Sequence, residues 1–122
     1  FGLREESLQS TVDAVRADGA QVVVLLSHNG MDVDLEMASR VRGLTAILGG
    51  HTHDAVPVAV EVTNPGGTTL VTNGGSNGKF VGVLDLDVAG GAVRDYRYRL
   101  LPVFANLLSE DPAMAALVQR VR

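Results

Sequence analysis

Two short apolar segments, separated by one amphipathic segment, constrain the fold of this chain most strongly. Residues 22–26 form a valine-rich run, and residues 46–48 form a second apolar run. Between them, residues 32–41 carry apolar side chains at helical spacing, and Gly43 ends the segment. Continuous apolar runs of this length are typical of strands buried on both faces. The pattern therefore predicts a βαβ unit with two parallel strands.

The flanking segments predict helices at both ends of the chain and β-strands in its second half. We expect helices at residues 5–17 and 111–122. Strand-like runs occupy residues 58–62, 68–72, 79–88 and 92–101, the last two around a glycine-rich turn. The predicted fold class is α/β (α+β), a βαβ unit followed by an antiparallel β meander. The strands would form a mixed sheet or two packed sheets with helices outside.

Composition excludes several classes of function. A length of 122 residues with 46% hydrophobic residues suffices for one small domain with a core. The net charge of −4, with scattered Lys and Arg residues, argues against nucleic acid or an anionic membrane as partner. The absence of cysteine excludes disulfides and thiolate metal ligands. No apolar stretch is long enough for a membrane span. The start at Phe1, without a signal peptide, predicts a chain that begins inside a longer gene product.

All three histidines follow the two predicted buried strands directly. His28 comes after the first strand, and His51 and His53 come after the second, preceded by two glycines. Parallel strands joined by a crossover end at the same edge of the sheet, which is where open α/β sheets bind ligands. Imidazole is the commonest metal ligand among side chains at neutral pH. We therefore expect the three imidazoles to converge on one place and to hold one or two metal ions.

The residues around the histidines leave alternatives open. A single loop histidine is usually a solvated surface residue, so each could be incidental. Asp54 could hold a ligating histidine or serve as a turn residue. Three histidines cannot complete a bridged two-metal site without further oxygen ligands. Asp32 and Asp34 lie near His28 in sequence, but we expect their helix to point them away from it.

A glycine-rich loop at residues 73–78 follows another predicted strand. Its polar side chains, Asn73, Ser76 and Asn77, could donate hydrogen bonds to substrate oxygens or to a partner. The same composition is typical of a turn that leads into a hairpin. Both interpretations remain open from the residues alone.

Two motifs resemble the end of a known catalytic domain. Ser27-His28 after one strand and Gly50-His51-Thr52-His53 after the next resemble the last two motifs of the calcineurin-like metallophosphoesterases. Within that superfamily the chain is most similar to the 5′-nucleotidase branch and to its SoxB-type thiosulfohydrolases. The stretches that carry this resemblance are residues 26–34, 49–57, 70–80 and 98–106.

The resemblance implies an incomplete active site. His53 would bind one metal ion, while His28 and His51 would bind the other, and the ions would be two divalent cations, manganese in this branch. The earlier motifs Asp-x-His, Gly-Asp-x-x-Asp and Gly-Asn-His-Asp/Glu, which supply the catalytic histidine and the bridging ligand, do not occur in the chain. Residues 1–105 would be the C-terminal half of a four-layer α-β-β-α catalytic domain. Residues 106–122 would begin a linker helix to another domain.

The same resemblance implies a function for the longer protein. It would be a periplasmic hydrolase of bacterial sulfur oxidation that releases sulfate from a cysteine S-thiosulfonate adduct on a SoxYZ-type carrier protein. From their position in the glycine-rich loop, and not from the resemblance, Asn73 and Asn77 are the candidate substrate contacts. A periplasmic 5′-nucleotidase or related phosphoesterase is the first alternative. The second is a metal-free folded module that associates into an oligomer through exposed sheet edges.

Overall fold

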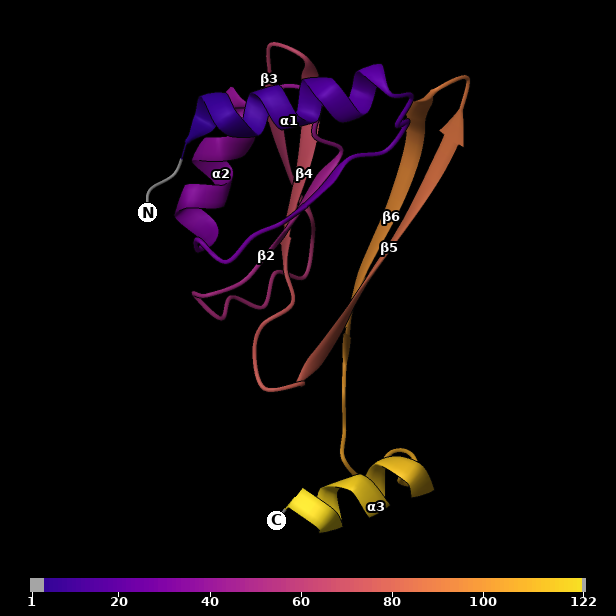
Figure 1. Cartoon of the computed structure of the whole chain (residues 1–122). Helices are drawn as coiled ribbons and strands as arrows, with labels where there is room; N and C mark the ends of the chain where they lie inside the picture. Colours follow the sequence, from indigo (N-terminus) through magenta and orange to yellow (C-terminus); the bar gives the residue numbers. More distant parts are fainter. Residues whose placement is uncertain (1–3, 122) are drawn as a thin grey trace.

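The computed structural model describes residues 4–121, so residues 1–3 of the predicted domain and Arg122 of the predicted last helix lie outside it. Figure 1 shows the arrangement of the elements. In chain order they are α1 (Glu5–Ala17), β1 (Val24–Leu26), α2 (Met31–Arg40), β2 (Ala46–Gly49), β3 (Val60–Asn64), β4 (Gly67–Asn73), β5 (Phe80–Ala89), β6 (Ala92–Pro102) and α3 (Pro112–Val121). The predicted elements are all present, with boundaries shifted by at most two residues.

Four strands form one sheet in the order β1-β2-β4-β3. β1, β2 and β4 are parallel, and β3 pairs antiparallel with β4. The expected βαβ unit is therefore confirmed, and β4 joins it as a third parallel strand. β4 is buried over five successive residues, as suits a central strand, whereas β3 is largely exposed at the edge. β5 and β6 form a separate two-stranded antiparallel hairpin.

Two helices cover one face of the four-stranded sheet. The core on this face joins residues of α1, α2 and the strands: Val12, Met37, Ala38, Val41, Leu44, Ile47 and Val71. α1 presents this core with Leu8 and Val12, one helical turn apart. Burial of these apolar side chains contributes most of the stability of the sheet–helix layer.

The β5–β6 hairpin covers part of the opposite face. Ala46, Ala59 and Leu70 of the first sheet region pack against Leu84, Leu86, Tyr96 and Tyr98 of the hairpin. The layers are thus helices, four-stranded sheet and hairpin, which is a mixed α/β architecture (Figure 1). On the hairpin side, β1 and β2 leave apolar side chains exposed: Val24 (41%), Leu26 (78%) and Leu48 (38%).

A partly buried polar network closes the amino end of the parallel strands. The Arg16 guanidinium donates to the carbonyl oxygens of Gly43, Ala20 and Gln21 and to the Thr45 hydroxyl. The same hydroxyl accepts from the Val23 amide at 3.2 Å. All these groups have partners, so the connection from α1 to the sheet is fixed without an unpaired donor.

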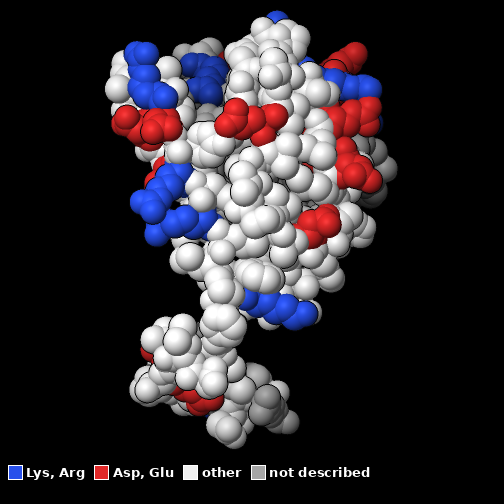
Figure 2. Space-filling model, turned by 180° about the vertical axis from the view of Figure 1, so that it is seen from behind, with Lys and Arg blue, Asp and Glu red and all other residues white. Residues whose placement is uncertain are grey.

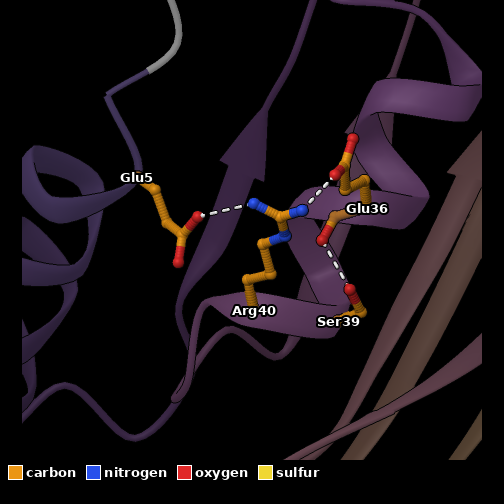
Figure 3. A network of polar contacts seen from close by, with 4 residues as sticks. All are labelled: Glu5, Glu36, Ser39 and Arg40. Carbon is orange, nitrogen blue, oxygen red and sulfur yellow. Dashed lines mark hydrogen bonds and ion pairs between the residues drawn. The ribbon is translucent and has the colours of Figure 1, made fainter.

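The surface carries both signs of charge. Figure 2 shows basic and acidic residues interspersed on the face that it presents, without a continuous basic area. In an exposed network, Arg40 pairs with Glu5 at 3.4 Å and with Glu36 (Figure 3). α3 lies beyond the hairpin, and it contains no buried residue (Figure 1). Among residues 4–121, no helix has the length and apolar character needed to cross a membrane.

Candidate metal centre

The parallel pairing of β1 and β2 places the two histidine loops side by side. Leu26 pairs with Leu48 in register, and the Ser27 amide donates to the Leu48 carbonyl at 3.0 Å. The next residue along the first loop is His28. Its ring lies edge-on to the ring of His51, with the centroids 5.2 Å apart. The sheet edge therefore brings together histidines that are 23 positions apart in sequence.

The backbone of the second loop adopts an unusual conformation at both histidines. His51 has a φ of 76° and His53 a φ of 60°, in the left-handed region that residues with a Cβ rarely adopt. The Thr52 amide donates to the Gly50 carbonyl at 3.1 Å, which makes the turn tight. Residues held in this region cluster at functional sites, because the surrounding structure must compensate for the strain.

Glycines allow the two loops to pack closely. A Cβ at Gly50 would lie 3.1 Å from Nδ1 of His28, and a Cβ at Gly30 would lie 2.9 Å from the Thr52 methyl group. Gly30 also has a φ of 96°. Larger residues at these two positions would separate the loops, so the glycines are required for the close approach of the histidines.

Thr52 connects the second loop to the helix that follows the first. Its hydroxyl accepts a hydrogen bond from the Met31 amide, at the start of α2, at 3.2 Å. The same hydroxyl donates to the Asp54 carboxylate. Asp54 therefore bonds within the loop, as expected for a turn residue, and it also accepts from the Gly75 amide through its backbone carbonyl at 2.7 Å.

Asp34 differs from its predicted orientation. The expectation that its helix would point it away from His28 is wrong, because the Ser27 hydroxyl donates to Asp34 Oδ1 and the carboxylate is fully buried. Asp34 Oδ2 has no hydrogen-bond partner within the described part of the chain. Burial raises the pKa of Asp34, and the hydrogen bond from Ser27 partly offsets that rise. Asp32, by contrast, is exposed.

The two asparagines predicted to contact substrate occupy different environments. Asn73 ends β4, pairs with Gly49 and is 1% exposed. Its Oδ1 accepts from the Gly75 amide at 3.2 Å, and its Nδ2 is buried without a partner in residues 4–121. Asn77 lies exposed at the tip of the glycine-rich loop with a φ of 57°. Their contact with a substrate stays a prediction.

The geometry of the histidines fits a metal ion in part. Two imidazoles bound to one ion through nitrogen place each ring centroid about 3.2 Å from the ion, so the centroids lie roughly 4.5–5.2 Å apart for bond angles of about 90–110°. The separation of 5.2 Å between His28 and His51 falls within that range. No group of three or more His, Asp or Glu side chains in residues 4–121 is placed to hold an ion together. The structure thus brings His28 and His51 together, but it does not show the expected convergence of three imidazoles among the described residues. The role of His28, His51 and His53 as metal ligands stays a prediction.

Sequence reasoning missed the residues that support the histidines. Thr52 joins the second loop to α2, and Asp34 joins α2 to the first loop. For Asp34 the sequence carried a signal, because it stands four positions before Ala38 and seven before Val41, which are both fully buried. This spacing puts Asp34 on the apolar face of α2.

The known proteins that are similar to this chain include a thiohydrolase, a nucleotidase and a phosphoesterase. The structure of the sulfate thiohydrolase SoxB from Thermus thermophilus, in complex with glycerol, superposes with a TM-score of 0.90 at 42% identity over 98% of this chain. A 5′-nucleotidase precursor, also from Thermus thermophilus, gives a TM-score of 0.83 at 31% identity over 99% of the chain. The trifunctional nucleotide phosphoesterase YfkN of Bacillus subtilis is 37% identical over 82 residues, or 66% of the chain. No family model matches the chain.

The chain spans only a small part of these relatives. It covers 21% of the SoxB chain, 27% of the nucleotidase precursor and 6% of YfkN. Together the likenesses support a SoxB-type or 5′-nucleotidase-type fragment of the metallophosphoesterase superfamily, and the predicted resemblance is confirmed. The mixed α/β fold is that of a partial metallophosphoesterase-type domain.

Proposed function

We propose that this SoxB-type or 5′-nucleotidase-type fragment supplies three histidine ligands to the two-metal centre of a hydrolase. The single observation that carries the proposal is the pairing of the His28 and His51 rings at the carboxyl edge of parallel strands. In this assignment His28 and His51 bind one divalent ion, and His53 faces a second ion that needs further ligands. Residues 4–121 contain no group of three His, Asp or Glu side chains placed to hold an ion, so each ion would need further ligands from outside the chain.

The residues of this chain would hold and orient the centre. Two bound cations polarise a tetrahedral anionic group and lower the pKa of a bound water, which is the chemistry that hydrolysis requires. His28 and His51 are held by the packing of Gly50 and Gly30 between their loops. Thr52 fixes the second loop against the first turn of α2 through the Met31 amide. The remaining oxygen ligands and the catalytic histidine would come from segments outside the 122 residues.

Two substrate classes are compatible with such a centre, because sulfonate and phosphate groups share a tetrahedral shape and anionic oxygens. The greater similarity to SoxB, at 42% identity against 31% for the nucleotidase precursor, favours a sulfur substrate. We therefore propose hydrolysis that releases sulfate from a cysteine S-thiosulfonate on a SoxYZ-type carrier protein, with manganese as the metal. Asn77, which is exposed, remains the proposed substrate-side residue in this scheme, whereas Asn73, at 1% exposed, would act from beneath the loop.

The location and domain organisation follow from the same proposal. One similar protein is a 5′-nucleotidase precursor, which supports export and hence a periplasmic location. Residues 1–105 would belong to the catalytic domain, and residues 106–122 would begin a linker. α3 has no buried residue, which is expected for a helix that leads out of a domain.

The test compares two substrates on the full-length gene product that contains this chain, after loading with Mn²⁺. We expect sulfate release from a carrier peptide with a cysteine S-thiosulfonate to exceed phosphate release from AMP in kcat/KM. His51→Ala should abolish either activity, whereas Asp32→Asn, at an exposed position of α2, should leave it unchanged.

Three results would redirect the proposal. Faster phosphate release would identify the nucleotidase alternative. Retention of activity in His51→Ala would remove the metal role of the histidines. A protein that binds no metal and hydrolyses neither substrate would be the metal-free module.

A further inference from the structure

The first loop is tied to α2 by a buried carboxylate. The Ser27 hydroxyl donates to Asp34 Oδ1, and it accepts from the backbone amide of Asn29 at 3.3 Å and from the Asn29 side chain at 2.9 Å. Ser27 and Asn29 are the neighbours of His28 on either side. Asp34 is 0% exposed, so this chain of hydrogen bonds is anchored in the interior. These hydrogen bonds tie the backbone on both sides of His28 to the buried carboxylate of Asp34.

The second loop is tied to the same carboxylate by close packing. A Cβ at Gly49 would lie 2.5 Å from Asp34 Oδ2, so the carboxylate rests directly on the backbone of the last residue of β2. Gly49 precedes Gly50 and His51. Asp34 therefore contacts both chain segments that lead to the histidines, at Ser27 and at Gly49.

The third parallel strand ends beside the same position. Asn73 pairs with Gly49 across the sheet and is 1% exposed. Because paired residues of parallel strands point to the same face, its side chain lies on the face of α2. Asn73 Nδ2 is a buried donor without a partner in residues 4–121, and Asp34 Oδ2 is a buried acceptor without one. Buried polar groups are almost always paired, so two complementary exceptions around Gly49 require an explanation.

We infer that Asp34 is a positioning residue that sets His28 through Ser27 and sets His51 through Gly49, with Asn73 completing the polar base of the histidine loops. The inference rests on the proposed metal role of the histidines for its functional consequence. Packing alone does not explain Asp34, because an apolar side chain would fill the same space without a buried unpaired oxygen. Groups that orient metal ligands in this way commonly change metal affinity when they are removed.

The test uses the 122-residue chain with four variants. Ser27→Ala removes the donor, and Asp34→Ala removes the acceptor and the contact with Gly49. Asp34→Asn keeps an oxygen acceptor for Ser27 in the same shape. Asp32→Ala is the matched control, because it lies in the same first turn of α2 but is exposed.

Two readouts separate positioning from a general loss of stability. The first is the nuclear Overhauser effect between the ring protons of His28 and His51 in metal-free protein, at a temperature where every variant is folded. The second is the dissociation constant for Mn²⁺, measured by calorimetry on the full-length gene product with the same substitutions, because the remaining ligands lie outside the 122 residues. We expect Ser27→Ala and Asp34→Ala to weaken the ring contact and to raise the dissociation constant by about 10-fold or more. Asp34→Asn should retain both properties within about threefold, and Asp32→Ala should match the wild type.

The outcomes are distinguishable from those that test the proposed function. An unchanged ring contact in both Ser27→Ala and Asp34→Ala would overturn the inference, whether or not Mn²⁺ binds. A full-length gene product that binds no Mn²⁺ would count against the metal role, and the ring contact in the chain would still decide the positioning role. If Asp34→Ala does not fold, Ser27→Ala decides alone, because it deletes one oxygen atom and leaves the helix intact.

Discussion

The polar groups at the two ends of the parallel strands differ: those at the amino end are partly or fully buried and paired, and two at the carboxyl end are buried with an unpaired atom. At the amino end, Arg16 makes hydrogen bonds to three carbonyl oxygens and to the hydroxyl of Thr45, and Thr69 donates to the Leu44 carbonyl at 3.0 Å. At the carboxyl end, Asp34 and Asn73 each keep one buried atom unpaired. The left-handed backbone of both His51 and His53 also lies at this end.

This contrast indicates a division of labour along the strands. Saturated hydrogen bonding stabilises a fold, so the amino end is expected to serve stability. Unpaired buried groups and strained backbone cost free energy, and they persist where function requires a fixed geometry. We therefore expect the carboxyl end to contribute less to stability, because its residues hold the histidine pair in a fixed geometry.

The largest effect should come from the amino end. Arg16→Met would leave the carbonyl oxygens of Gly43, Ala20 and Gln21 without their donor, so we expect the free energy of unfolding to fall by about 3 kcal/mol. Urea denaturation measures this loss. Arg40→Met is the control, because Arg40 sits in the exposed network of Figure 3 and should cost below about 0.5 kcal/mol.

The Arg16 variant also tests the division itself. A fall in stability with an unchanged dissociation constant for Mn²⁺ would support it. Equal stability in Arg16→Met and Arg40→Met would contradict it.

At the carboxyl end, Gly49→Ala should be the most damaging conservative change. The new Cβ would lie 2.5 Å from Asp34 Oδ2 and 3.2 Å from the Thr72 carbonyl oxygen, and the backbone cannot yield easily. We expect a loss of about 2 kcal/mol in denaturation experiments, together with weaker Mn²⁺ binding. Gly74→Ala is the matched control, because a Cβ there meets no atom within 4 Å. Equal behaviour of the two variants would argue against a tight contact at Gly49.

The pH dependence of stability should reveal the burial of Asp34. Its pKa is raised above 3.8 by burial, so the folded state binds the proton more tightly than the unfolded state. The stability that the protonated Asp34 contributes is fully present below its unfolded-state pKa of 3.8. It is lost as the pH rises through the higher pKa of the folded state. Relative to Asp34→Asn, the metal-free wild type should thus lose stability with rising pH, by about 1.4 kcal/mol for each unit of elevation.

The free energy of unfolding of the wild type and of Asp34→Asn is measured by urea denaturation, with a chelator present to keep both proteins metal-free. The measurements run from about pH 3 to about pH 8, which spans the ordinary carboxyl pKa values. A stability difference that grows in favour of the wild type as the pH rises would indicate a lowered pKa and would refute the burial argument.

How far the sequence predicts this molecule depends on the range of the interactions involved. The βαβ unit and the hairpin follow from local patterns, since the apolar runs at residues 22–26 and 46–48 report burial directly. The common edge for the histidine loops follows from the crossover between parallel strands, and the pairing of His28 with His51 agrees with it.

Other features of the site were beyond local patterns. The left-handed conformation at His51 and His53 has no signal, because that region is usually marked by glycine. The place of β4 beside β2 depends on pairing between distant segments, which periodicity does not encode. Asp34 was misjudged because its charge outweighed its position on the buried face of α2.

The smallest effect should come from an unpaired group outside the site. The Tyr98 hydroxyl is buried under the hairpin without a partner in residues 4–121, and burial raises its pKa. Tyr98→Phe should leave stability unchanged or raise it by up to about 1 kcal/mol. Tyr96→Phe should instead lower stability slightly, because the Tyr96 hydroxyl donates to Glu61 at 2.6 Å. Thermal unfolding measures the stability of both variants. A clear loss of stability in Tyr98→Phe would show that buried groups without a hydrogen-bond partner also matter away from the histidine end.

The most direct measurement is the position of manganese in crystals of the full-length gene product that contains this chain, located by anomalous scattering. The account predicts a peak bonded by nitrogen atoms of both His28 and His51, between rings that already lie 5.2 Å apart. Manganese bound elsewhere on the surface, or peaks that these two rings do not share, would contradict it.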